Sequence, residues 1–210
     1  MAVRARLTQA WRELCASSGL HEAHPLGAAL IEAYSESHRR YHDCGHLAYL
    51  LDEIERRSAL IHDAALLRFA AWFHDAIYDP LAKDNEARSA DWAQRDLLRH
   101  GMEAERAEAI ARLVHKTASH HAGEARPDEA LFLDMDFSIL GSDRQIYAIY
   151  ADAIRAEYAA VPDDAFRAGR VAFLKNVLTQ PRMFRTEVYE REMADAARAN
   201  IAWEIARLEV

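Results

Sequence analysis

Residues 70–80 read AAWFHDAIYDP, an apolar run that carries an imidazole and a carboxylate side by side at His74 and Asp75. Between Leu66 and this pair, the only polar side chain belongs to Arg68. Such a run should lie deep inside the fold, where an ionised carboxylate is costly unless it is paired or coordinates a metal. The stretch alone therefore leaves two interpretations open, a pair of metal ligands or a buried hydrogen-bonded pair.

The composition is that of a globular, helix-forming protein. Of 210 residues, 51% are apolar and 29% are charged, and only seven are Gly and five are Pro. The net charge of -8 argues against a general nucleic-acid binder. Two cysteines, Cys15 and Cys44, offer no disulfide framework, and the N-terminus does not resemble a signal peptide. Because no apolar run approaches the ~20 residues that cross a bilayer, we expect a cytoplasmic protein without a membrane partner.

Apolar residues recur at helical spacing along the chain, without an alternating strand pattern or a repeat. No linker is long enough to separate two domains. The sequence therefore predicts one all-α domain over residues 1–210. The expected helices lie near 3–17, 25–34, 47–54, 62–78, 85–99, 110–117, 131–140, 143–160, 163–178 and 186–208.

A second histidine lies on an apolar helix face. His46 is in phase with Leu50 and Ile54, while His42 lies one turn earlier and is the rival candidate. A single histidine on such a face is often only a hydrogen-bonded core residue, so His46 gains weight only in combination with other ligands.

Two carboxylates, Asp134 and Asp136, lie in the apolar segment 131–141. Being two residues apart, they point to different sides of a helix, and one metal cannot easily take both. The residues three and four positions from Asp136 are all apolar, so we expect Asp136 on the buried face as a ligand. Asp134 should be less enclosed, with a hydrogen bond at a helix end or to a metal ligand.

A third polar group closes the helix that ends near Thr117. Either His120 or His121 continues its apolar stripe. The functional interpretation is a cation aimed at a substrate phosphate, and the alternative is a histidine stabilised by the helix C-terminus.

Taken together, His46, His74, Asp75 and Asp136 supply two imidazoles and two carboxylates from three helices. This nitrogen and oxygen ligation suits one divalent metal ion with open positions for water. Mn, Fe, Mg, Ni, Co and Zn all remain candidates. A second ion, with His115 and His120 contributing, is the less favoured option.

The ordered set His46, His74-Asp75 and Asp136 resembles the HD superfamily of metal-dependent phosphohydrolases. Closer similarity is to its small stand-alone group of predicted metal-dependent HD phosphohydrolases, and it extends over nearly the whole chain. This resemblance implies an all-helical fold and a metal held by these four residues, but it supplies no substrate. The matching blocks are Arg40-Tyr41-His42-x-x-x-His46, residues 72–78 (WFHDAIY), Asn85-Glu86-x-x-Ser89-Ala90, Thr117-x-x-His120, residues 133–141 (LDMDFSILG) and Ala197-Arg198-x-Asn200-Ile201-x-x-Glu204.

The expected activity is hydrolysis of a phosphoester of a small molecule, for which a nucleotide is one candidate. Asp75 or Asp79 would accept the proton of a metal-activated water, and His120 would bind the phosphate or protonate the leaving group. Arg40 and Lys83 are candidate phosphate contacts, with ordinary surface charge as the alternative.

The next helix begins at Asn85-Glu86, whose backbone amides could bind an anion. The simpler interpretation makes Asn85, or its neighbour Asp84, a helix cap and lets Glu86 complement the helix dipole. Glu86 could also orient a ligand histidine from behind.

Two other functions remain open, a metal-binding regulatory protein without turnover and an iron-dependent oxygenase. The sequence also leaves open the substrate, the native metal and the oligomeric state, with a homodimer as one option.

Overall fold

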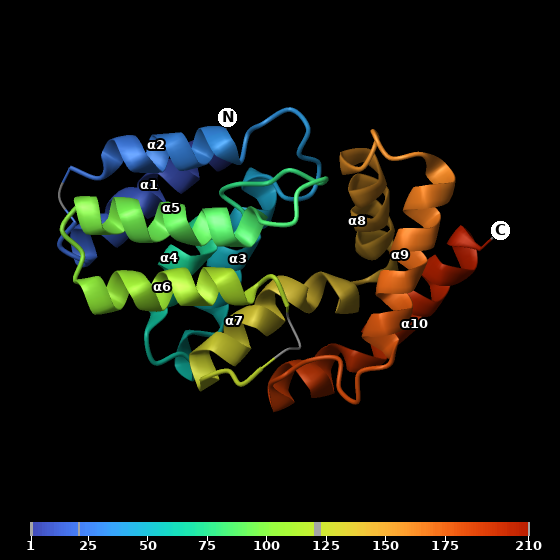
Figure 1. The fold of residues 1–210 in the computed structure, drawn as a ribbon. Coiled ribbons are helices and arrows are strands. Elements are labelled where there is room, and N and C mark those ends of the chain that lie inside the picture. Colours follow the sequence, from blue (N-terminus) through green and yellow to red (C-terminus); the bar gives the residue numbers. More distant parts are fainter. Residues whose placement is uncertain (1, 21, 120–122, 210) are drawn as a thin grey trace. The chain divides into compact units, whose positions relative to one another are not determined.

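The computed structural model describes residues 2–20, 22–119 and 123–209, and within these ranges the regular secondary structure is helical, without strands (Figure 1). The predicted all-α fold is therefore confirmed. The chain divides into two compact units, Met1–His120 and His121–Val210, which we call the first and the second unit. That residues 1–210 act as one domain stays a prediction.

The first unit is built around α4. This helix is the most apolar part of the chain, and Phe69 to Phe73 are all 0% exposed. Trp11 of α1 packs edge-on against Trp72, with 5.0 Å between ring centroids. Gly27 of α2 allows this packing, because a Cβ there would lie 2.2 Å from the Trp11 ring. The helices of the unit are α1 (Ala2–Ser17), α2 (His24–Ala33), α3 (Cys44–Arg56), the 3-10 turn η1 (Ser58–Leu60), α4 (Ala64–Phe73), α5 (Asn85–Arg99) and α6 (Ala104–Lys116).

Two long helices complete the first unit, α5 beside α6, and α6 in turn packs on α4 (Figure 1). The start of α4 is fixed by Asp63, whose carboxylate accepts a hydrogen bond of 2.9 Å from the amide of Leu66. The same carboxylate takes two bonds of 2.9 Å from Arg106 of α6. The cap of the buried helix is thereby tied to a neighbouring helix.

The second unit is organised around the long C-terminal helix α10, which packs against η2, α9 and α8. Gly141 lets η2 approach α10 closely, because a Cβ there would lie 2.6 Å from Cβ of Met193. Asn200 of α10 donates bonds of 2.8 Å to the carbonyls of Leu140 and Ser142. The elements of this unit are α7 (Pro127–Phe137), η2 (Ser138–Gly141), α8 (Arg144–Glu157), α9 (Asp163–Leu178) and α10 (Glu187–Leu208).

Most predicted helices agree with the observed ones to within a few residues, but the expected helix over residues 62–78 is too long. The observed helix α4 begins at Ala64 and ends at Phe73, so His74 and Asp75 lie in the turn that follows. The helix expected over 131–140 starts earlier, at Pro127, and tightens into 3-10 geometry from Ser138.

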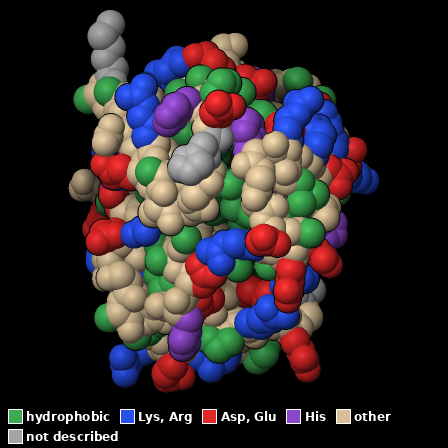
Figure 2. All heavy atoms as spheres, turned by 90° about the vertical axis from the view of Figure 1, so that its left-hand side faces the viewer, with side chains coloured by type: hydrophobic (Ala, Val, Ile, Leu, Met, Phe, Trp, Pro, Cys, Tyr) green, Lys and Arg blue, Asp and Glu red, His purple; other side chains and the backbone are tan. Residues whose placement is uncertain are grey.

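The described part of the chain contains no helix that is both long and apolar enough to cross a membrane. On the face drawn in Figure 2, Lys and Arg side chains are interspersed with Asp and Glu side chains rather than gathered in one basic patch.

Candidate metal centre

His46 lies in the first turn of α3, which Asp43 caps. The Asp43 carboxylate accepts hydrogen bonds from the amides of Gly45 and His46, at 2.7 and 3.3 Å. The cap fixes the start of the helix and so the position from which the His46 ring projects. The ring is buried, with the ring of Tyr41 at 4.8 Å between centroids.

His74 follows the last residue of α4. Its amide still donates to the carbonyl of Ala70 at 2.9 Å, and its ring is almost fully buried at 1% exposure. The ring Nδ1 lies 2.9 Å from the carbonyl oxygen of Ala71. Because a carbonyl oxygen can only accept, Nδ1 must carry the proton, which leaves Nε2 of the neutral ring with a lone pair.

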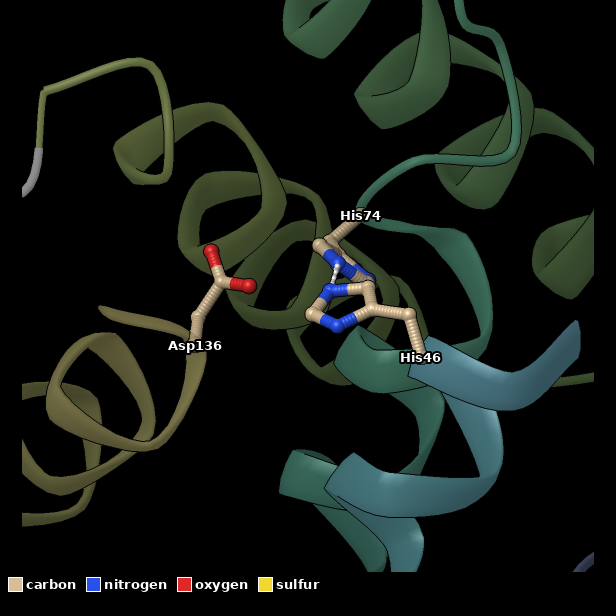
Figure 3. Close-up of side chains that lie close together, drawn as sticks. All are labelled: His46, His74 and Asp136. Atoms are coloured by element: carbon tan, nitrogen blue, oxygen red, sulfur yellow. Dashed lines mark hydrogen bonds between the residues drawn. The ribbon is translucent and has the colours of Figure 1, made fainter. Parts of the chain in front are cut away.

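Three atoms of the first unit that can ligate a metal lie close together in a small triangle. Nε2 of His46 lies 3.0 Å from Nε2 of His74, and the two rings face each other through these nitrogens (Figure 3). The Asp75 Oδ2 lies 3.0 Å from the Nε2 of His74 and 3.8 Å from that of His46. We call this set the His46–His74–Asp75 triangle.

The chemistry of the triangle fits a divalent cation. Nε2 of His74 lies 3.0 Å from both Nε2 of His46 and Oδ2 of Asp75, and a single proton on this nitrogen can serve only one of these two contacts. One extra proton would serve one contact, whereas a metal ion would serve all three atoms. Metal bonds to such donors are about 2.0–2.2 Å, which places ligands at right angles roughly 3 Å apart.

Tyr34 is a residue of this site that the sequence did not reveal. Its fully buried hydroxyl donates to the carbonyl of Ala71 and accepts from the amide of Asp75, both at 3.2 Å. It also lies 3.3 Å from Nδ1 of His74. The Tyr34 hydroxyl therefore bonds to the Ala71 carbonyl and the Asp75 amide, which would bond to each other if α4 continued.

Arg39 is the second residue that sequence reasoning missed. Its guanidinium donates to the carbonyls of Asp75 at 2.6 Å and Ala76 at 3.1 Å, and to that of His42 at 3.0 Å. These bonds, with those of Tyr34, explain why α4 ends before His74. Arg39 lies in a polar, basic stretch of sequence, and nothing in that stretch indicates that this one arginine is buried.

The second unit holds the two carboxylates of α7, and their predicted ranking by burial is wrong. Asp134 is 2% exposed, whereas Asp136 is half-buried. The Asp134 carboxylate accepts from the amides of Arg185 and Thr186, both at 2.7 Å, and from Oγ1 of Thr186 at 2.6 Å. Burial raises its pKa, and the bonds from Thr186 and Arg185 oppose the rise.

The reason for this error is that Asp134 meets a segment far away in the sequence. Counting apolar neighbours on one helix gives no information about the residues that precede α10. The hydrogen-bonding role expected for Asp134 is present, at the start of α10. That Asp136 joins His46 and His74 as a metal ligand stays a prediction.

The loop after the triangle is held by side-chain hydrogen bonds. Asn85 joins its two ends, because its amide accepts from the Asp79 amide at 3.0 Å and donates to the Asp79 carbonyl at 2.8 Å. The exposed Asp79 carboxylate accepts from the amide of Leu81 at 2.9 Å. Asn85 is thus the first residue of α5 rather than its cap, and Asp84, in the cap position, makes no side-chain cap bond.

The remaining predicted residues are located as follows. Arg40 and Lys83 are exposed, as is His115, and Glu86 is half-buried. The rings of His42 and His46 lie 6.0 Å apart between centroids. His120 and His121 lie outside the described residues, so their expected roles stay predictions.

Comparisons of the chain with protein-family models, with curated proteins and with solved structures find no match. The similarity to the HD superfamily therefore rests on the sequence blocks given above. What the geometry adds is a buried cluster of imidazole and carboxylate donors that fits a cation.

Proposed function

We propose that the chain is a metal-dependent phosphohydrolase of a small phosphorylated molecule, with nucleotides among the candidate substrates. One observation carries the proposal, the cluster in which Nε2 of His46, Nε2 of His74 and Oδ2 of Asp75 lie 3.0 to 3.8 Å from one another. A hydrogen-bonded core pair needs only two such atoms, so the convergence of three favours metal ligation over the structural alternative.

The proposed ligands are His46, His74 and Asp75, with Asp136 as the fourth. When bound there, a divalent ion lowers the pKa of a water molecule toward ~7 and neutralises charge on a phosphoryl oxygen. Two carboxylates among the ligands balance the charge of such an ion. The buried walls of the first unit keep bulk water from the two imidazoles, which are 5% and 1% exposed.

The other residues of the proposed site act on protons and on the phosphate. The hydrogen bond from Nδ1 of His74 to the carbonyl of Ala71 keeps Nε2 in the ligating form. Asp75, or the exposed Asp79, would accept the proton that leaves the attacking water. Arg40 and Lys83, both exposed, would attract the substrate's phosphate, and His120 would protonate the leaving group.

The test is a metal analysis joined to a phosphoester screen. The chain, stripped with a chelator, is reloaded with Mn, Fe, Mg, Ni, Co or Zn and assayed for phosphate release from a broad panel that includes nucleotides. We expect turnover only with a bound divalent ion, and its loss in Asp75→Asn. The matched control is Asp96→Asn, which alters a carboxylate of the same unit that bonds to Trp92 and Arg95.

Each alternative has its own outcome. Bound metal without turnover on the panel would replace the proposal with a binding or regulatory role. Two irons per chain without phosphate release would favour an oxygenase. A chain that retains none of the six metals would contradict the metal centre itself.

A further inference from the structure

The two segments that carry the triangle are joined by side chains rather than by a shared helix. His46 lies on α3, just after the loop of residues 39–43, and His74 and Asp75 lie in the turn that ends α4. Arg39 bonds to both segments. One guanidinium nitrogen donates to His42 in the loop at 3.0 Å and to Asp75 in the turn at 2.6 Å.

Tyr34 and Arg39 also hold the peptide groups on both sides of Asp75. The Asp75 amide donates to the Tyr34 hydroxyl at 3.2 Å, and the Asp75 carbonyl accepts from Arg39. With both peptide groups fixed, the direction in which the Asp75 side chain leaves the backbone is fixed as well. The Tyr34 hydroxyl lies 3.3 Å from Nδ1 of His74, so it contacts both adjacent ligands.

The burial of the charged Arg39 side chain costs free energy, which its contacts near the triangle must offset. Its side chain is 0% exposed, while its ion-pair partner Glu36 is 48% exposed. Removing a charge from water requires hydrogen bonds at most of its donors, and the carbonyls near the triangle supply them. The guanidinium also lies 5.2 Å from the ring centre of Tyr34 and 5.5 Å from that of Tyr78, so it contacts the faces of two aromatic rings.

From these contacts we infer that Tyr34 and Arg39 are positioning residues of the metal centre: Tyr34 holds His74 and Asp75 in place, and Arg39 fixes the spacing of these two ligands from the segment of His46. The inference rests on the proposed metal site and adds two residues that bind no metal themselves. A planar guanidinium reaches several carbonyls at once, which an ammonium group cannot do. Metal affinity should therefore depend on the planar guanidinium group of Arg39 and not only on its charge.

The experiment is a calorimetric titration with Mn²⁺ of the chelator-treated full chain and its variants. Partners that orient metal ligands typically contribute about 10–100-fold in affinity, so we expect a loss of that order in Arg39→Met. Arg39→Lys should bind with intermediate affinity, and Tyr34→Phe should lose roughly 10-fold. Melting in chelator measures the fold of each variant independently of metal.

The matched control is Arg170→Met, which removes another buried arginine, one that bonds to Glu204 in the second unit. It should lower the melting temperature while leaving the affinity for Mn²⁺ unchanged. If Arg39→Met fails to fold, Tyr34→Phe, which loses one oxygen atom, decides the question. Folded variants that bind Mn²⁺ as the wild type does would overturn the inference alone, whereas a wild type that binds no Mn²⁺ would overturn the proposed centre and the inference with it.

Discussion

Two polar clusters of this chain differ in the kinds of atoms that they bring together. In the second unit, the Glu204 carboxylate accepts from Nε of Arg170 at 2.8 Å and from the Tyr147 hydroxyl at 2.5 Å. Each of its oxygens thus meets a donor. In the His46–His74–Asp75 triangle of the first unit, two imidazole nitrogens and a carboxylate oxygen, all able to ligate a metal, lie 3.0 to 3.8 Å apart.

This difference separates a stabilising cluster from one suited to binding. Hydrogen bonds between buried donors and acceptors offset part of the free energy that is lost when these groups leave water. Removing one partner leaves the other buried without a hydrogen bond. Three ligand atoms at this spacing gain most when a cation lies between them. The Tyr147–Arg170–Glu204 cluster should therefore contribute to folding, whereas the triangle should contribute to affinity for a metal ion.

The largest expected effect is on stability in the second unit. Glu204→Gln leaves the buried guanidinium of Arg170 without its counter-ion, and breaking such a pair costs about 3–5 kcal/mol of unfolding free energy. Urea unfolding in the presence of a chelator measures this loss. Under the same conditions His74→Ala should cost less, since the ligand atoms of the triangle contribute mainly to affinity for a metal ion, which the chelator removes.

If Glu204→Gln and His74→Ala lowered the unfolding free energy equally, the proposed division between the two clusters would fail. The control is Glu187→Gln. The Glu187 side chain is 78% exposed and pairs with Arg182. Exposed pairs of this kind contribute little, so that variant should unfold like the wild type.

A smaller effect should distinguish the two carboxylates of α7. Asp134→Asn weakens three hydrogen bonds to residues 185 and 186, and we expect a loss of about 1–3 kcal/mol with metal binding retained. Asp136→Asn should instead weaken metal binding at least ~10-fold, by loss of a charged ligand. Paired urea and Mn²⁺ titrations of both variants check this, and the reverse pattern would remove Asp136 from the ligand set.

The smallest effect concerns a buried titratable group outside both clusters. Burial raises the pKa of the Cys15 thiol from 9.0 to about 11. Between these values the unfolded chain has lost a proton that the folded chain keeps, so unfolding free energy falls as pH rises from about 9 to about 11. The fall should be on the order of 1–2 kcal/mol.

Urea unfolding at several pH values, for wild type and Cys15→Ala, isolates this contribution. The variant should lack that part of the decline, since alanine carries no proton to lose. Parallel profiles for the two chains would show that the thiol is not held protonated by burial.

The fold follows from the sequence to a large degree because the helices here are locally encoded. Apolar periodicity places most of the expected helices close to their observed positions, and the adjacent His74 and Asp75 mark the candidate site. The end of α4 was not predictable in this way, because it depends on Tyr34 and Arg39, more than 30 residues earlier in the chain. Local patterns carry no information about such contacts.

The same limit applies to the candidate site. The burial of Asp134 depends on residues about 50 positions later, and the buried state of Arg39 depends on carbonyls of the turn after α4. Residue type and helical phase identify which side chains can bind a metal. They do not identify which side chains hold those ligands in place.

The most direct test of the central claim follows the ring nitrogens themselves. In the chain labelled with ¹⁵N-histidine, a titration with Zn²⁺ should shift the Nε2 signals of His46 and His74 together, at the same metal-to-protein ratio. The Nδ1 of His74 should stay protonated throughout, because it donates to the carbonyl of Ala71. Nε2 signals that do not respond to Zn²⁺, or a metal-induced loss of the Nδ1 proton, would contradict a metal centre at this triangle.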